Sequence, residues 1–233
     1  LLKDLETKKS VFLIHKHNNP CGVAIRDNLL DAYLDALSCD NVSAFGGILT
    51  SNQAIDIKVA EEINKLFFEV LIAPNFSESA LDLLKSKKNR IIIKLKAYPK
   101  NKLQTRSCLN GILEQDIDDK IEKFDDFKVV TKISPNSTKS DDLVLASIIV
   151  KHTKSNCIAI VKNKQLIGSG MGQVSRIDAL NQAIEKSKKF GFDPNESCLA
   201  SDAFFPFSDC VEISHANNIN SVSYTHLRAH ETQ

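Results

Sequence analysis

The chain has 233 residues, of which 42% are hydrophobic and 25% charged, a composition typical of globular proteins. Its 30 basic and 29 acidic side chains leave a formal net charge of +1, so no general positive field attracts nucleic acid or an anionic membrane. The sequence has no apolar run of about 18 residues, and its N-terminus lacks the layout of a secretion signal. These features predict a cytoplasmic protein that binds neither nucleic acid nor membrane.

The cysteines stand singly, without a Cys-x-x-Cys pair and without the density of a disulfide scaffold, so we expect reduced thiols. They are Cys21, Cys39, Cys108, Cys157, Cys198 and Cys210. The first residue is Leu1 rather than methionine, which we interpret as the loss of upstream residues from a longer protein.

The first hundred residues alternate short apolar runs with helical patterns. An apolar β-branched run at 11–14 predicts a buried strand that ends at a polar loop, residues 16–22. The pattern then predicts a helix at 28–38, an extended segment at 44–49, a helix at 57–67, a strand at 70–73, a helix at 79–85 and a strand at 91–95. Helices interleaved with short strands argue for an α/β sheet covered on both faces.

A second α/β block follows a connecting segment at 101–136, in which we expect one strand at 128–132. The later elements are a helix at 139–152, strands at 157–161 and 166–168, a helix from the N-cap Ser175 to about 190, a strand at 199–202 and a helix at 209–217. The chain therefore divides into two similar α/β halves, residues 1–100 and 137–222.

Lys16 and His17 stand together at the end of the first predicted strand. A fixed cation beside a group that titrates near neutral pH can stabilise an oxyanion while it moves a proton. The same residues are also consistent with a solvated lysine and a loop histidine beside a turn-forming sequence. On this motif alone both interpretations stay open.

A metal site is not expected. His15 and His17 have the alternation of a strand, and no third ligand stands at a typical spacing. Pro20-Cys21 resembles half of a zinc deaminase signature, but the second cysteine would fall at Ala24, and His-x-Glu is absent. Zinc-activated water chemistry is therefore disfavoured.

Two later motifs are candidate ligand sites. Gly168-Ser169-Gly170-Met171-Gly172 lacks the endings of the phosphate and dinucleotide loops, yet glycines before a helix can present backbone donors to an anion, with Arg176 adding a planar donor fork. A tight turn with a solvated arginine is the alternative. The aromatic run 204–207 is typical of core packing, but Asp202 and Asp209 beside it suit recognition of a flat nitrogenous ring.

Five motifs in order resemble one known family, the aminoimidazole carboxamide ribonucleotide (AICAR) transformylase region of the bifunctional purine biosynthesis enzymes, which also carry an inosinate cyclohydrolase domain. The motifs are Lys16-His17-Asn18-Asn19-Pro20-Cys21-Gly22, Ser43-Ala44-Phe45-Gly46-Gly47, Ile72-Ala73-Pro74, Gly170-Met171-Gly172-Gln173-Val174-Ser175-Arg176 and Ser201-Asp202-Ala203-Phe204-Phe205-Pro206-Phe207. The resemblance extends from about residue 11 to residue 222.

The resemblance implies transfer of a formyl group from 10-formyltetrahydrofolate to the amine of AICAR, with His17 as proton acceptor and Lys16 as stabiliser of the formyl oxygen. It assigns AICAR binding to Gly46, Glu69, Asn156, Arg176 and Phe204, and folate binding to Ile177 and Asp209. It also implies two subdomains like cytidine deaminase without zinc, and a homodimer with shared active sites. Lys16 and His17 would then meet the Arg176 and Phe204 group across the interface.

The chain departs from the family at both ends. The cyclohydrolase domain is absent, together with an Arg-Tyr pair that helps bind AICAR, and a late motif containing Arg and His is missing. Residues 223–233 do not resemble the family and are interpreted as an artefact, so His226, Arg228 and His230 receive no role. Two alternatives stay open: an inactive nucleotide-binding fragment of the same fold and, less favoured, a zinc-dependent deaminase.

Overall fold

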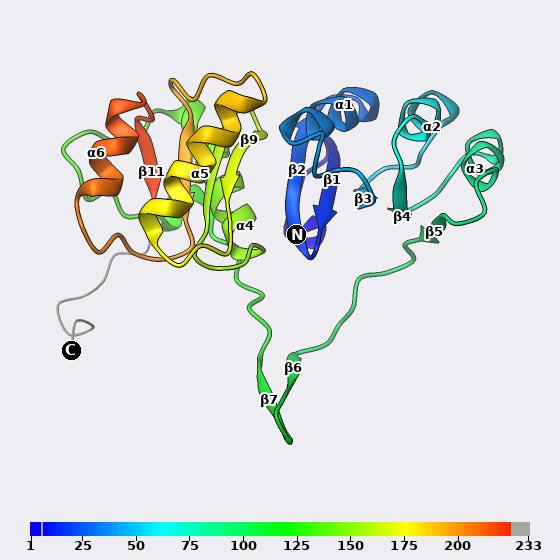
Figure 1. Ribbon diagram of the computed structural model, residues 1–233, viewed down its shortest axis with the longest axis horizontal. Coiled ribbons are helices and arrows are strands. Elements are labelled where there is room, and N and C mark those ends of the chain that lie inside the picture. The colour runs from blue at the N-terminus through cyan, green and yellow to red at the C-terminus, as the bar shows by residue number, and fades with distance from the viewer. Residues whose placement is uncertain (6, 225–233) are drawn as a thin grey trace.

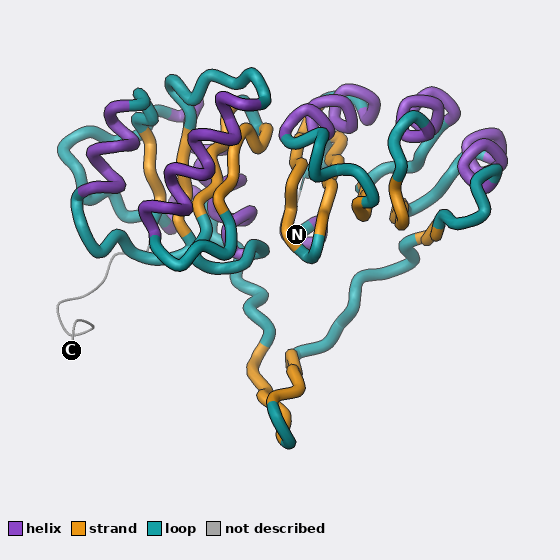
Figure 2. The backbone as a smooth tube through the Cα atoms, in the orientation of Figure 1, coloured by secondary structure: helices purple, strands orange, loops and turns teal. Residues whose placement is uncertain are grey.

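The computed structural model describes residues 1–5 and 7–224. These residues form one nine-stranded mixed sheet with the order β11-β10-β8-β9-β2-β1-β3-β4-β5 and a separate two-stranded hairpin, β6-β7. Figure 1 shows the hairpin projecting from the body of the molecule as an arm, and Figure 2 shows the long loops that lead into and out of it. The predicted α/β class is confirmed.

The elements have the following bounds. In chain order they are η1 (Leu2–Asp4), β1 (Ser10–Lys16), β2 (Asn19–Arg26), α1 (Leu29–Cys39), β3 (Gly47–Ser51), α2 (Ile57–Asn64), β4 (Phe68–Ala73), α3 (Glu78–Lys85), β5 (Ile91–Lys94), β6 (Leu103–Cys108), β7 (Gly111–Asp116), η2 (Phe124–Asp126), α4 (Ser137–Lys151), β8 (Ile158–Lys162), β9 (Gln165–Gly170), α5 (Arg176–Lys189), β10 (Cys198–Ser201), α6 (Asp209–Ala216) and β11 (Ser221–Ser223).

The two halves of the sheet repeat one order of connections. In the first, β1 and β2 form an antiparallel hairpin, α1 follows, β3 pairs antiparallel with β1, and α2 leads to the parallel strand β4. In the second, β8 and β9 form the hairpin, α5 follows, β10 pairs antiparallel with β8, and α6 leads to the parallel strand β11. The same β-β-α-β-α-β unit therefore occurs twice, with β2 and β9 adjacent at the centre.

Alternation along the strands directs side chains to different layers of helices. In β1, Phe12 and Ile14 join the cluster packed against α1, α2 and α3, whereas Val11 and Leu13 join a cluster containing α4. In β8 the alternate residues divide between α4 and the pair α5 and α6. Since the α4 cluster spans both halves, α4 covers one face of the sheet and the other five α-helices cover the opposite face.

Few backbone pairs join the two halves. β2 and β9 share the pair Ala24 and Gln165, and Ile25 N donates to Lys164 O at 3.0 Å. The Arg26 guanidinium strengthens this seam, because it donates across it to Gln165 Oε1 at 2.9 Å and to Asn163 O at 2.8 Å. Side chains thus supply much of the connection between the halves.

One predicted strand is wrong, and four observed strands are missing from the prediction. Residues 128–132 form no strand, and Val129 and Val130 are 45% and 47% exposed. A short β-branched sequence makes a strand only where another strand pairs with its backbone, and none of the described strands pairs with these residues. The unpredicted strands are β2, β6, β7 and β11, while every other predicted element is present with ends shifted by at most three residues.

Five of the six cysteines are buried, and all six are free in the described part of the chain. Burial raises the pKa of the thiols of Cys21, Cys39, Cys157 and Cys198 to about 12, which keeps them protonated at neutral pH. Among the helices of residues 1–5 and 7–224, none is long and apolar enough to cross a bilayer.

Candidate active site

The Lys16-His17 motif lies in a tight hairpin turn rather than in the predicted seven-residue loop. Lys16 pairs with Asn19, and the turn residues between them, His17 and Asn18, have φ values of 50° and 64°. Two consecutive left-handed residues are characteristic of the two-residue turns that match the twist of a hairpin. His17 is therefore exposed at the tip, while residues 20–22 continue into the buried strand β2.

Lys16 is held beside the turn that precedes β3. Its Nζ donates to Phe45 O at 2.5 Å, and a Cβ on Gly46 would lie 2.9 Å from that nitrogen. Gly46 has a φ of +69°, and its N–H donates to Phe67 O at 2.8 Å. The structure thus brings Lys16 and Gly46 together, with an ammonium group beside a backbone that carries no side chain.

Two exposed aromatic rings and a carboxylate border this position. Phe45 and Phe67 are 62% and 47% exposed, and their ring centroids lie 4.9 Å apart. The exposed Glu69 follows on β4, one residue after Phe68, which pairs with Gly47. Lys16, Gly46 and Glu69 therefore lie at the same end of three neighbouring strands.

A second polar cluster surrounds Arg176, the first residue of α5. Its Nη1 bonds to Asp202 Oδ1 and donates to Cys157 O at 3.0 Å, and its Nη2 donates to Asn156 Oδ1 at 2.8 Å. The predicted N-cap Ser175 is confirmed, since its Oγ accepts from Asp178 N at 3.1 Å. Arg176 is 8% exposed, so the alternative of a solvated arginine is wrong.

The glycine-rich motif has a different structure from the predicted loop. Residues 168–170 belong to β9, and the loop begins only at Met171, whose N–H donates to Gln182 Oε1 at 3.0 Å. The first two glycines therefore lie under α5 rather than in front of it. The loop 171–175 turns the chain from β9 into the helix that carries Arg176.

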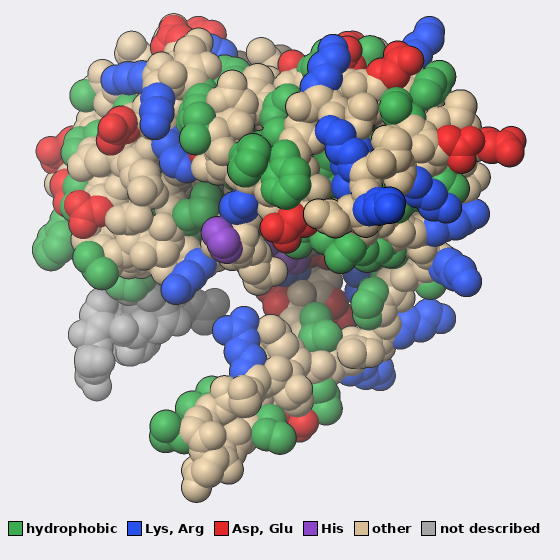
Figure 3. All heavy atoms as spheres, turned by 45° about the vertical axis from the view of Figure 1, so that its right-hand side comes forward, with side chains coloured by type: hydrophobic (Ala, Val, Ile, Leu, Met, Phe, Trp, Pro, Cys, Tyr) green, Lys and Arg blue, Asp and Glu red, His purple; other side chains and the backbone are tan. Residues whose placement is uncertain are grey.

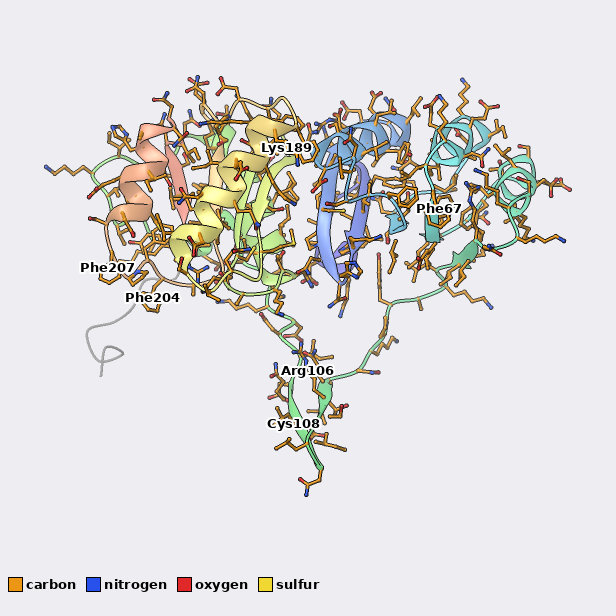
Figure 4. The ribbon with its side chains drawn as sticks, viewed as in Figure 1. Phe67, Arg106, Cys108, Lys189, Phe204 and Phe207 are labelled. Atoms are coloured by element: carbon orange, nitrogen blue, oxygen red, sulfur yellow. The ribbon has the colours of Figure 1, made fainter. Side chains whose placement is uncertain are left out.

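The remaining candidate residues border the Arg176 cluster. Phe204 follows β10 and is 37% exposed, with the more exposed Phe207 nearby (Figure 4). Ile177 packs against the core formed by α5 and α6. Asp209 begins α6, and its Oδ1 accepts from Cys210 N at 2.7 Å.

One hydrogen-bonded link connects the two polar clusters within the chain. Asn19, at the start of β2, accepts a hydrogen bond on Oδ1 from Lys154 N at 2.9 Å, and Lys154 O accepts one from Gly172 N at 2.8 Å. Asn156 lies two residues after Lys154. The sequence motifs include Asn19 but give no sign of this link, because Lys154 is far away in the sequence.

The strand order nevertheless keeps the candidate residues apart. Between Glu69 on β4 and Phe204 after β10 lie six strand intervals. At about 4.8 Å per interval this is about 29 Å. Figure 4 agrees, since Phe67 and Phe204 lie on opposite halves of the molecule. Within one chain, no small ligand contacts the whole predicted set.

The sequence predicts no metal site, and the clustering of possible ligands can be checked in the described part of the chain. No group of three or more His, Cys, Asp and Glu side chains in residues 1–5 and 7–224 is placed to hold a metal ion. Burial lowers the pKa of His15 to about 4, so this imidazole is neutral near pH 7.

A sheet with basic, amide and aromatic side chains along one end defines a candidate enzyme of the α/β class. A family model described as the AICARFT/IMPCHase bienzyme matches residues 1–186. The chain belongs to this family.

The curated relatives include bacterial proteins described as the bifunctional purine biosynthesis protein PurH. The protein from Bacteroides thetaiotaomicron is 53% identical over 217 residues, which cover 93% of this chain and 43% of the relative. The protein from Acetivibrio thermocellus is 46% identical over 89% of this chain and 40% of its own length, and that from Aquifex aeolicus is 42% identical over 92% and 42%. The chain therefore spans about two fifths of the length of these relatives.

Proposed function

We propose that this chain is the formyl-transfer region of its family: it transfers the formyl group of 10-formyltetrahydrofolate to the exocyclic amine of AICAR in cytoplasmic purine biosynthesis. The observation that carries the proposal is the hairpin turn with Lys16 fixed beside Gly46 and His17 exposed next to it. The proposal gives this chain one of the family's two activities, since the chain spans about two fifths of the length of its relatives.

The chemistry requires a proton acceptor and a cation at the reacting atoms. The amine of AICAR attacks the formyl carbon, and His17 accepts the proton that the nitrogen loses. The formyl oxygen becomes an oxyanion in the tetrahedral intermediate, and the Lys16 ammonium stabilises it. Collapse breaks the bond from the formyl carbon to folate N10, which takes up a proton, and releases tetrahydrofolate.

The ligands would be shared between the two polar clusters. We assign AICAR binding to Gly46, Glu69, Asn156, Arg176 and Phe204, and folate binding to Ile177 and Asp209. A guanidinium and an amide suit the oxygens of a ribonucleotide, and a carboxylate suits the N–H groups of a pterin ring.

We further propose a homodimer in which one chain supplies Lys16 and His17 and its partner supplies the Arg176 group. The separation of about 29 Å between Glu69 and Phe204, both assigned to AICAR, supports this, because one AICAR molecule contacts both residues only if they come from different chains. The arm gives a second reason. Its side chains Leu103, Ile112 and Leu113 are 47%, 72% and 62% exposed, and an isolated hairpin is marginal in water. Figure 3 shows hydrophobic side chains on the surface of the projecting arm.

The repeated β-β-α-β-α-β unit supports a related proposal, that residues 1–100 and 137–222 are two subdomains like cytidine deaminase without zinc, joined by residues 101–136. The proposed artefact at 223–233 lies outside the described residues from residue 225 onward.

The test of the activity is AICAR-dependent formation of tetrahydrofolate by the full chain. His17→Ala should abolish turnover, whereas His215→Ala, which replaces an exposed histidine on α6, should leave it unchanged. AICAR binding without turnover would favour the inactive fragment. Production of inosinate from formylated AICAR, or chelator-sensitive release of ammonia, would contradict the proposal.

The test of the shared site uses mixed dimers of His17→Ala and Arg176→Ala subunits with different tags. If each site combines the two chains, one of the two sites in a mixed dimer carries both native residues, so about half of the wild-type activity returns. If each site lies within one chain, no activity returns.

A further inference from the structure

Asp202 is a largely buried carboxylate, and both of its oxygens accept hydrogen bonds from the protein. It follows β10, and its side chain is 9% exposed. Oδ1 accepts from Cys157 N at 2.8 Å and from Arg176 Nη1, while Oδ2 accepts from the Ser155 hydroxyl. Oδ1 therefore has both of its acceptor positions filled by protein donors, whereas Oδ2 lies nearer the surface with the Ser155 hydroxyl bound to it. This use of the carboxylate by the protein disfavours the sequence-based interpretation of Asp202 as a group that recognises a nitrogenous ring.

The contacts of Asp202 determine the orientation of Arg176. Asp202 and Cys157 O hold Nη1, and this direction sets the plane of the whole guanidinium. Arg176 Nε is buried and has no hydrogen-bond partner among the described residues.

Arg176 in turn determines the orientation of Asn156. An arginine only donates hydrogen bonds, so the amide oxygen of Asn156 must face Nη2, where it accepts at 2.8 Å. Its Nδ2 then points to Gln173 O, to which it donates at 2.9 Å. The orientation passes from Asp202 to Arg176 and from Arg176 to Asn156.

We propose that Asp202 is a positioning residue: it fixes Arg176 and Asn156 in the arrangement that receives the ribonucleotide, without contacting the ribonucleotide itself. This inference rests on the proposed function. Asp202 also balances the charge of a buried guanidinium, which would otherwise have to find another partner or turn toward water.

The experiment compares Asp202→Asn with the full wild-type chain. Asparagine has nearly the same shape and keeps an acceptor for Cys157 N, but it removes the charge that holds Arg176. Arg176 loses the hydrogen bond to its charged partner, and we expect it to bind AICAR equally in the ground state and in the transition state. The KM for AICAR should therefore rise about tenfold, while kcat stays unchanged. The control Asp141→Asn, which alters an exposed pair with Lys164 at 2.7 Å, should leave both constants unchanged.

A double variant distinguishes positioning from direct contact. If Asp202 acts through Arg176, then Asp202→Asn combined with Arg176→Gln binds AICAR no more weakly than Arg176→Gln alone. Additive losses would overturn the inference and indicate an independent contact. Should Asp202→Asn fail to fold, Ser155→Ala removes only the hydrogen bond to Oδ2, and the same comparison with Arg176→Gln applies.

Calorimetric titration of the wild-type chain with AICAR separates the two proposals. If the wild type does not bind AICAR, the proposed function fails. If the wild type binds and Asp202→Asn binds equally well, the proposed function survives and the positioning role of Asp202 is refuted.

Discussion

Replacing Gly170 by alanine should destabilise the protein strongly, because helix α5 crosses β9 at this position. A Cβ on Gly170 would lie 1.9 Å from Ala179 O, whereas ordinary contact begins near 3.4 Å, so the helix would have to move by 1.5 Å. Overpacking of a core costs about 1–3 kcal/mol and can cost more. Because the obstacle here is backbone, we expect a loss of about 3 kcal/mol, which corresponds to a fall in Tm of about 6–12 °C.

Gly172→Ala is the matched control within the same motif. The nearest atom to its Cβ would be Lys154 Cδ at 3.6 Å, so only the left-handed φ of +66° opposes the substitution. That conformation costs an alanine about 1–2 kcal/mol. Urea unfolding followed by circular dichroism gives both values, provided that the m-value is unchanged. Equal losses in the two variants would refute the packing explanation of Gly170.

Two further predictions concern the seam and the thiols. Burial raises the pKa of Asp40, but hydrogen bonds from Lys186 and Ser43 outweigh it and hold the pKa below its usual value. This carboxylate therefore stabilises the fold above its unfolded pKa near 3.9, and the contribution is lost as the pH falls through the lower folded value. Asp40→Asn should lower the free energy of unfolding by about 2 kcal/mol at pH 7 and by clearly less at pH 2.5, and a loss independent of pH would contradict this. A thiol reagent should label the native chain rapidly at the exposed Cys108 alone, so Cys108→Ser should remove the fast phase, and fast labelling of any second cysteine would conflict with the burial of the other five.

Hydrophobic periodicity predicted most of the helices and strands, because the pattern of a buried face can be recognised from residues that are close together in the sequence. It could not find β2, since Asn19-Pro20-Cys21-Gly22 has the composition of a turn. The hairpin accommodates Pro20 at a register shift opposite His15, and proline in a sheet is typical of such irregular positions. The hairpin β6-β7 was missed for another reason: its side chains are exposed, so no buried face imposes a clear apolar pattern.

The sequence likewise predicted some residues of the candidate site and could not predict the function of others. The turn composition indicated Lys16 and His17, and the capping pattern placed Arg176 at the start of a helix. The function of Asp202 could not be predicted, because its partners Ser155, Cys157 and Arg176 precede it by 47, 45 and 26 residues. Only folding brings these groups together.

The arm has a consequence for the integrity of the chain. The covalent path between the halves runs outward along β6 and returns along β7, whereas the contacts of β2, β9, α1 and α4 hold the halves together within the body (Figure 1). Trypsin has an exposed target in the arm at Arg106, which Figure 4 shows beside Cys108 on the hairpin. A single cut there should leave two fragments that migrate separately under denaturing conditions yet remain one particle in native solution.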